Sequence, residues 1–468
     1  MSVNRLFACQ ALPLAVDEGD FMDFSEIKQI LADAAEKLGI AHYDVYYVRN
    51  NSVSAETFKD EISSFSSENS IGLCFRCLID GRFGYASCEK ITKEELCTLV
   101  SKAAENAVYI ENEDEAILFE GSPAYREIEH ECLPMPSASE LRELALKMQR
   151  QTYEESEFVS DGTECSVGAS EISIDLCNSY GLSLHKEASV YSAVASAVVT
   201  KDGESEDDYA YCLGKSFDHT KELSEKAVSS ALSKLGATAL ESGNYPVVIS
   251  GKQMSILLDT FSGVFSAKSV KLGLSLLKGK EGEKIASDKI TLVDDPYSEH
   301  LVAKTPFDAE GVSTETKTVI KDGVLQTFLY DLTTAAAMGK KTTANASKAG
   351  YASAIVISPY YFGIEAGDTP FDELLAKADG GVYITQLKGL HAGANAVTGD
   401  FSIESAGFLI ENGKKGRPVK SFTIAGNFYE LLKDIEHLSD TVTVGVPGVF
   451  HAVGAPDIFL RNVSIAGK

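Results

Sequence analysis

The 468-residue chain is short of basic residues and of long hydrophobic runs. It has 42 lysines and arginines against 69 aspartates and glutamates, which gives a formal net charge of −27. Nucleic-acid binding needs a basic surface that displaces counterions, so we expect no nucleic-acid partner. The longest apolar runs, 352–359 and 442–453, are far shorter than the ~20 residues of a membrane-spanning helix. We therefore expect no membrane association, and the absence of a clear secretory signal predicts a cytoplasmic location.

Cysteine is also sparse. The chain has nine cysteines, an odd number, and none follows Cys212. This usage does not fit a disulfide-stabilised scaffold, so we expect reduced thiols. Cys74 and Cys77 form a CxxC pair, but 71–79 has the composition of a strand. Because residues three apart in a strand point to opposite faces, we expect these two thiols not to share a metal ion.

The pattern of apolar residues predicts an α+β protein. An apolar face at helical spacing begins after Asp23 and ends before Gly39, and a second such face follows Thr92. Strand-like stretches occupy 43–48 and 53–58, and Asp80-Gly81 predicts a hairpin turn within 71–86. A helix over 139–153, a β-meander over 165–214 and a helix over 221–235 follow.

The length predicts two or three domains. We expect an N-terminal arm at 1–21, an α+β region at 22–240 and a β-rich domain with a central helix at 241–468. A division of the second region into 22–115 and 116–240 is left open. Near the C-terminus, the apolar spacing predicts a helix over 428–438.

Common catalytic motifs are missing. There is no phosphate-binding P-loop, no dinucleotide-binding glycine fingerprint and no nucleophile elbow. His130-Glu131 is followed by prolines and lacks the second histidine of a helical zinc motif, which favours a loop. Two further histidines lie near acids and are candidates for the floor of a cleft, although a lone histidine more often has a structural role. These cleft candidates are His300 with Asp308 and Glu310, and His391 with Asp400.

Several short stretches of the sequence are distinctive. They include KGKEGEKIAS (278–287), VDDP (293–296), PFDAEG (306–311), GLHAGAN (389–395) and TGDFS (398–402). These stretches, in this order, resemble the TldD/PmbA family, and more closely its PmbA (TldE) branch. The resemblance extends over nearly the whole chain from about residue 22, and the order of the stretches is more specific than any one motif.

The resemblance implies proteolysis, with a departure in this chain. The TldD branch is similar to zinc metallopeptidases with a His-Glu-xxx-His motif on a helix and a later Cys ligand. In this chain the corresponding positions hold Asp259, Thr260 and Val264, and no Cys follows Cys212. Val264 cannot bind a metal, and the general base is replaced by Thr260. We therefore expect no catalytic residue and no metal ligand in this chain, and zinc only in a TldD-like partner.

Three functional hypotheses follow from the resemblance. The first is a zinc-free, non-catalytic subunit that supports proteolysis of unfolded peptides, as a dimer with a TldD-like subunit or with itself. The second is an active peptidase that uses another site, built from the cleft candidates named above. The third is a regulatory binding protein, because the family has been linked to modulation of DNA gyrase. The negative net charge would disfavour acidic substrates.

Overall fold

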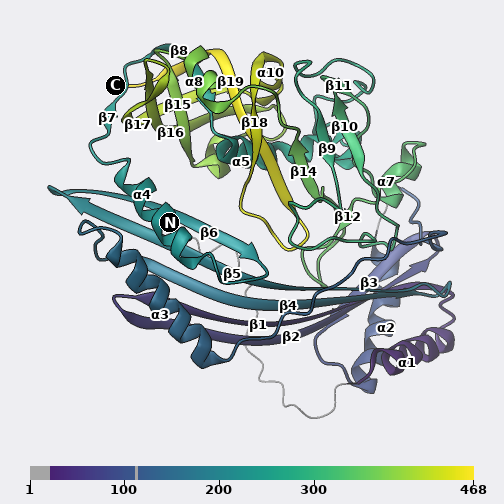
Figure 1. The fold of residues 1–468 in the computed structure, drawn as a ribbon. Helices are drawn as coiled ribbons and strands as arrows, with labels where there is room; N and C mark the ends of the chain where they lie inside the picture. The colour runs from purple at the N-terminus through teal and green to yellow at the C-terminus, as the bar shows by residue number, and fades with distance from the viewer. Residues whose placement is uncertain (1–21, 111–113) are drawn as a thin grey trace.

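The computed structural model describes residues 22–110 and 114–468, so the expected arm at 1–21 lies outside the described residues. Figure 1 shows two layers, with the long strands of an N-terminal sheet lying below a C-terminal domain. Within the described ranges, no helix combines the length and the apolar character needed to cross a bilayer.

The N-terminal part is built around one six-stranded antiparallel sheet in the order β3-β2-β1-β4-β5-β6. Since β1 pairs with β4 along its whole length, the two halves left open by the sequence, 22–115 and 116–240, share this sheet. The elements in chain order are α1 (Phe24–Lys37), β1 (His42–Phe58), β2 (Glu61–Ile79), β3 (Arg82–Cys88), α2 (Lys93–Tyr109), α3 (Ala138–Glu154), β4 (Glu164–Asn178), β5 (Ser183–Lys201), β6 (Glu204–Gly214) and α4 (Thr220–Leu232).

The two faces of this sheet have different neighbours. On the outer face, α1 and α2 bury one end of the sheet, and α3 and α4 bury the other end. The inner face meets the C-terminal domain. Cys77 packs among the residues of α1 and α2, whereas Cys74 packs on the inner face beside Tyr46. The expectation that these two thiols point in opposite directions is therefore confirmed.

The C-terminal part is a β-rich domain with a central helix, as expected, and the α+β class is confirmed. Its 11-stranded sheet surrounds α5, which contacts β15, β18 and β19. The elements are β7 (Thr238–Ala239), β8 (Gly243–Ile249), α5 (Gly251–Phe261), the 3-10 helix η2 (Ser262–Phe265), α6 (Ala267–Lys271), β9 (Leu292–Asp294), β10 (Lys317–Lys321), β11 (Val324–Leu325), α7 (Leu332–Ala337), β12 (Ala346–Ser347), β13 (Val356–Ile357), β14 (Tyr361–Ile364), α8 (Phe371–Lys377), β15 (Val382–Lys388), α9 (Leu390–Gly393), β16 (Asp400–Glu411), β17 (Lys414–Asn427), α10 (Phe428–Asp434), β18 (Ile435–Val444) and β19 (Ala452–Ala466).

Helix α5 is amphipathic. Met254, Leu257, Leu258 and Phe261 are completely buried, and the ring of Phe261 stacks on Phe428 at 4.6 Å between centroids. The packing of this apolar side fixes the direction in which the opposite side of the helix points.

The expected helix over 428–438 is wrong at its C-terminal end. Helix α10 stops at Asp434, and Ile435 begins β18 by pairing with Leu460 of β19. The apolar residues after 434 are buried by this pairing, so burial within a sheet produced the pattern that had predicted a longer helix.

A buried ionic contact joins the two layers at a place that we call the interdomain seam, formed by Asp44, Arg76 and Lys186 of the sheet and by 305–312 of the C-terminal domain. The Nε of Arg76 donates to both carboxylate oxygens of Asp44 at 3.1 Å, and its Nη1 lies 3.9 Å from Glu310 Oε1. Lys186 Nζ donates to Thr305 Oγ1 at 2.6 Å and to the carbonyl of Phe307 at 3.0 Å.

We predict that Arg76→Met lowers the free energy of unfolding by about 3–5 kcal/mol, because it leaves the buried carboxylate of Asp44 without its cation. The side chain of Arg76 is only 13% exposed. The matched control is Arg49→Met, since the Arg49 side chain is 51% exposed and its ion pair with Asp175 should contribute below about 1 kcal/mol. Urea denaturation of both variants measures the difference, and equal losses would contradict this role for the seam.

Candidate functional site

The positions that correspond to the zinc motif lie on α5 and η2. The Ser250 side chain caps the helix by accepting from the backbone N–H of Gln253 at 3.4 Å. Asp259 emerges on the side of α5 opposite the core, and its side chain is 52% exposed. Thr260 Oγ1 donates to the carbonyl of Ile256 at 2.8 Å, and Val264 is 1% exposed within the core. Of these three positions, only Asp259 therefore presents a group that could act as a metal ligand, its carboxylate.

That carboxylate is paired with a histidine that the sequence did not single out. His451 precedes β19, and its Nε2 lies 3.1 Å from Asp259 Oδ1. Its Nδ1 lies 2.9 Å from the carbonyl of Pro359. Because both neighbours are acceptors, both ring nitrogens donate only in the imidazolium form. Burial lowers the pKa of His451, but the hydrogen bond and charge of Asp259 outweigh it, so the pKa is raised overall.

These residues do not fit a zinc ion. A catalytic zinc site uses three protein ligands drawn from His, Cys, Asp and Glu, with one position left open. Here Asp259 is bound to His451, Thr260 is bonded to its own helix, and Val264 has no donor atom. Within 22–110 and 114–468, no cluster of three such side chains is arranged to hold a metal.

Two of the cleft candidates, Asp308 and Glu310, lie buried in the interdomain seam. Asp308 Oδ1 accepts from the backbone N–H groups of Glu310 and Val312 at 2.9 Å, and its Oδ2 accepts from Ala346 at 3.2 Å. Glu310 Oε2 accepts from the backbone of Leu332 at 2.9 Å. Burial raises the pKa of both carboxyls. These hydrogen bonds hold the loop that packs against the sheet.

The other candidates lie apart from this pair. His300 stands on a turn and packs against Tyr361 at 4.9 Å between ring centroids. His391 is exposed on α9, and Asp400 is exposed at the start of β16, where it accepts from Asn427 Nδ2 at 2.9 Å. In the part of the chain that the structure describes, no hydrogen bond or ion pair links these three side chains to one another or to Asp308 and Glu310.

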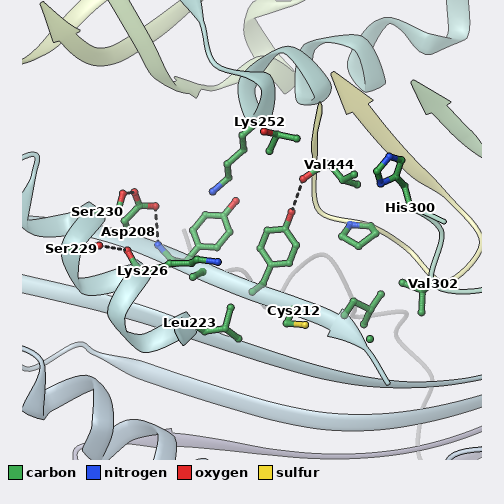
Figure 2. Close-up of a pocket in the computed structure, with 18 of the residues that line it drawn as sticks. Asp208, Cys212, Leu223, Lys226, Ser229, Ser230, Lys252, His300, Val302 and Val444 are labelled. Atoms are coloured by element: carbon green, nitrogen blue, oxygen red, sulfur yellow. Dashed lines mark hydrogen bonds between the residues drawn. The ribbon is translucent and has the colours of Figure 1, made fainter. Parts of the chain in front are cut away.

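A large cavity lies along the outer edge of β6, between α4 and the C-terminal domain (Figure 2). Its volume is about 1050 Å³, and His300 is among the residues that line it. Tyr209 and Tyr211 of β6 also line it. Lys252 Nζ lies 4.3 Å from the centre of the Tyr209 ring, and the Tyr211 hydroxyl donates to the carbonyl of Val444 at 3.4 Å. Reading the sequence alone did not locate this cavity, because its walls come from distant segments.

Comparison with known proteins matches three segments of the chain to the domain models of one family. Models of PmbA/TldA metallopeptidase domain 1, central domain and C-terminal domain match residues 43–107, 133–235 and 242–467. The chain belongs to the PmbA/TldD family.

Individual relatives agree with this assignment. An uncharacterized protein of Methanocaldococcus jannaschii is 30% identical over 404 residues, which cover 85% of this chain and 91% of the relative. Metalloprotease PmbA of Escherichia coli O157:H7 is 32% identical over 272 residues, but these cover only 57% of this chain and 56% of that protein. Among solved structures, TldE from Thermococcus kodakarensis has a TM-score of 0.83 and 25% identity, and the match covers 94% of this chain and all (100%) of that one.

A second structure broadens the comparison. A Thermotoga maritima protein described as a proposed modulator of a DNA gyrase has a TM-score of 0.85 and 28% identity, and the match covers 95% of this chain and 100% of that one. The shared fold therefore extends over both layers of the molecule.

We predict that Glu310→Gln flattens the pH dependence of stability. Burial, together with Asp308, raises the pKa of Glu310 from 4.5 to about 8. Between these pH values the folded chain keeps a proton that the unfolded chain releases, so the free energy of unfolding contributed by Glu310 falls as the pH rises. The wild type should lose up to roughly 1 kcal/mol per pH unit relative to the variant. Urea denaturation across this range tests it, with the exposed Glu283→Gln as the control that should keep the wild-type slope.

We predict that Asp259→Asn lowers the pKa of His451, because the variant removes the charge that outweighs burial. The native pair contributes stability below the ordinary histidine value of 6.5, and this contribution disappears as the pH rises through the raised pKa. Both side chains are partly exposed, so the loss should stay below about 1 kcal/mol. Histidine ring signals followed by NMR measure the shift, with His437 as an internal reference. An unchanged His451 titration would show that the contact does not form in solution.

Proposed function

We propose that this chain is a PmbA/TldE-like subunit of a cytoplasmic TldD/TldE-type metalloprotease. In this role it carries no zinc and no catalytic residue of its own. It supports the proteolysis of unfolded peptides by a TldD-like subunit, which carries the zinc ion. The names of the relatives support this assignment at the level of the family, since they include metalloproteases PmbA and TldD and a TldE structure.

The observation that carries the proposal is the pairing of Asp259 with His451. A free carboxylate on α5 could still contribute one ligand to a metal, but this one is hydrogen-bonded to His451, whose pKa it raises. Val264, one turn further along the chain, is buried among apolar side chains and offers no lone pair. These motif positions lack the ligands that would hold a Lewis acid to polarise a scissile carbonyl, and Thr260 occupies the position of the general base that would activate water.

The contribution of this chain would then be to enclose and hold the substrate. Among the described residues, β6 pairs only with β5, so its outer edge has no strand partner. The cavity lies along this edge, and residues 208–214 of β6 line it. An extended peptide could pair with the edge by strand addition, which uses main-chain hydrogen bonds and needs no particular sequence. Most strands of a folded protein are already paired on both edges or protected at the free edge, so this mode favours unstructured chains.

The proposal predicts activity only from the pair. The purified chain alone should not cleave an unstructured peptide and should contain no stoichiometric zinc by elemental analysis. A TldD-like subunit should cleave the peptide faster once this chain is added, and the two should elute together in size-exclusion chromatography. The control is a TldD-like subunit in which the glutamate of the zinc motif is changed to Gln, because activity should then vanish while the complex remains.

Each alternative has a distinct result. Peptide cleavage by this chain alone, together with bound zinc, would favour an active peptidase and overturn the proposal. Binding of purified DNA gyrase without any association with a TldD-like subunit would favour a regulatory binding protein instead.

A further inference from the structure

Two ammonium groups reach the cavity beside β6 without an acidic partner. Lys252, on the first turn of α5, extends into the cavity and packs against the ring of Tyr209 (Figure 2). Lys415, near the start of β17, lies 3.6 Å from the centre of the Phe408 ring. Across 22–110 and 114–468, no carboxylate lies within 4.0 Å of either ammonium. Burial lowers the pKa of both groups, and for Lys252 the charge of Asp208, which is itself paired with Lys234, offsets only part of this effect.

The other basic side chains that line the cavity are already neutralised. Lys226 pairs with Glu222 at 3.3 Å, and Lys215 pairs with Glu131 at 2.8 Å.

The acidic side chains that line the cavity do not neutralise the positive charges of Lys252 and Lys415. Asp208 is held by Lys234 at 2.9 Å on the side of α4. Among the described residues, this leaves Glu299 as the one acidic side chain of the lining without a cation. The unpaired charges of the cavity are therefore mainly positive, although the chain as a whole carries a net charge of −27.

The dimensions of the cavity indicate the size of the ligand. Its volume of about 1050 Å³ is at the upper end of the range that holds drug-sized ligands. A single inorganic anion would fill little of this space, whereas several residues of an extended peptide would fill it. The unpaired edge of β6 supplies main-chain donors and acceptors for such a peptide. The rings of Tyr209 and Tyr211 add apolar contact area.

We infer that this cavity binds acidic segments of extended peptides, with Lys252 and Lys415 pairing with glutamate or aspartate carboxylates of the ligand. The inference rests on the proposed role of the chain in holding peptide substrates, and it adds a preference for one kind of side chain. It is opposite to the expectation from the net charge. At about 0.1 M salt, charges more than ~10 Å apart are screened, so the nearby lysines outweigh the distant acids.

The test measures binding to the full-length chain by isothermal titration calorimetry at about 0.1 M salt. The probes are a short, unstructured, glutamate-containing peptide with blocked ends and the same peptide with every Glu replaced by Gln. The wild type should bind the Glu peptide on the order of 10-fold more tightly than the Gln peptide. The variant Lys252→Gln/Lys415→Gln should bind both peptides alike.

The control has the same change in charge at another place. Lys321 and Lys341 are exposed, have no ion pair with any residue that the structure describes, and do not line the cavity. Lys321→Gln/Lys341→Gln should therefore keep the preference for the Glu peptide. Lys252→Arg/Lys415→Arg should keep it as well, and thermal unfolding checks that each variant is folded.

Each remaining outcome decides a separate question. Equal affinity of the wild type for the two peptides, or binding of neither, would overturn the inference and leave the proposed subunit role standing. Equal loss of preference in both Lys→Gln double variants would also overturn it, because the effect would then come from total charge. Preferential binding of the Glu peptide, without any effect of this chain on a TldD-like subunit, would support the site and contradict the proposed function.

Discussion

The interdomain seam determines how the rest of the molecule is arranged. Arg76 and Asp44 rise from the inner face of the sheet, and Glu310 meets them from the C-terminal domain. Buried ion pairs of this kind add little net stability compared with apolar packing, but breaking one is costly, so they favour a single relative placement of two surfaces. The cavity has one wall from β6 and α4 and another from the C-terminal domain. Its shape therefore depends on a contact elsewhere on the same sheet.

The alternation of side chains along the strands lets one sheet serve three purposes. Residues of one parity bury the helices, and those of the other parity face the C-terminal domain. This inner face carries the interdomain seam on β1, β2 and β5, and at the β6 edge it carries Tyr209 and Tyr211. A shift of one residue in the register of β6 would place these two rings against α4 and expose the small residues that pack there. The register of β6 therefore determines which of its side chains pack in the core beneath α4 and which form the floor of the cavity.

The sequence predicted local structure well and long-range contacts poorly. Helical spacing located α1, α2, α3 and α4, and Asp80-Gly81 located the β2–β3 turn, because these signals lie within a few residues of one another. The same reasoning extended α10 beyond Asp434, since the apolar residues that follow are buried by β19, far away in the sequence.

The candidate site shows the same limit. The resemblance located Asp259 and the loss of donors at Thr260 and Val264, but it did not single out His451, which is 192 residues away from Asp259 along the chain. No local pattern marks that partner. Lys252 and Lys415 likewise look like ordinary surface lysines in the sequence, and only the fold brings both to one cavity. The net charge of the chain did not predict the charge of the cavity, because it sums over residues that the fold places far from one another.

The pair of Asp259 and His451 also explains why the loss of metal donors leaves a stable site. The carboxylate of Asp259 is half exposed and is hydrogen-bonded to His451, whose pKa it raises, so the acidic group left on α5 is both hydrated and partnered. A proton neutralises a carboxylate, but unlike a zinc ion it offers no open coordination position for water or for a carbonyl oxygen. Under the proposed function, selection on such a chain would act on binding surfaces and not on reacting atoms. The unpaired edge of β6 and the two lysines without counter-ions are the features of the described residues that a bound peptide would use.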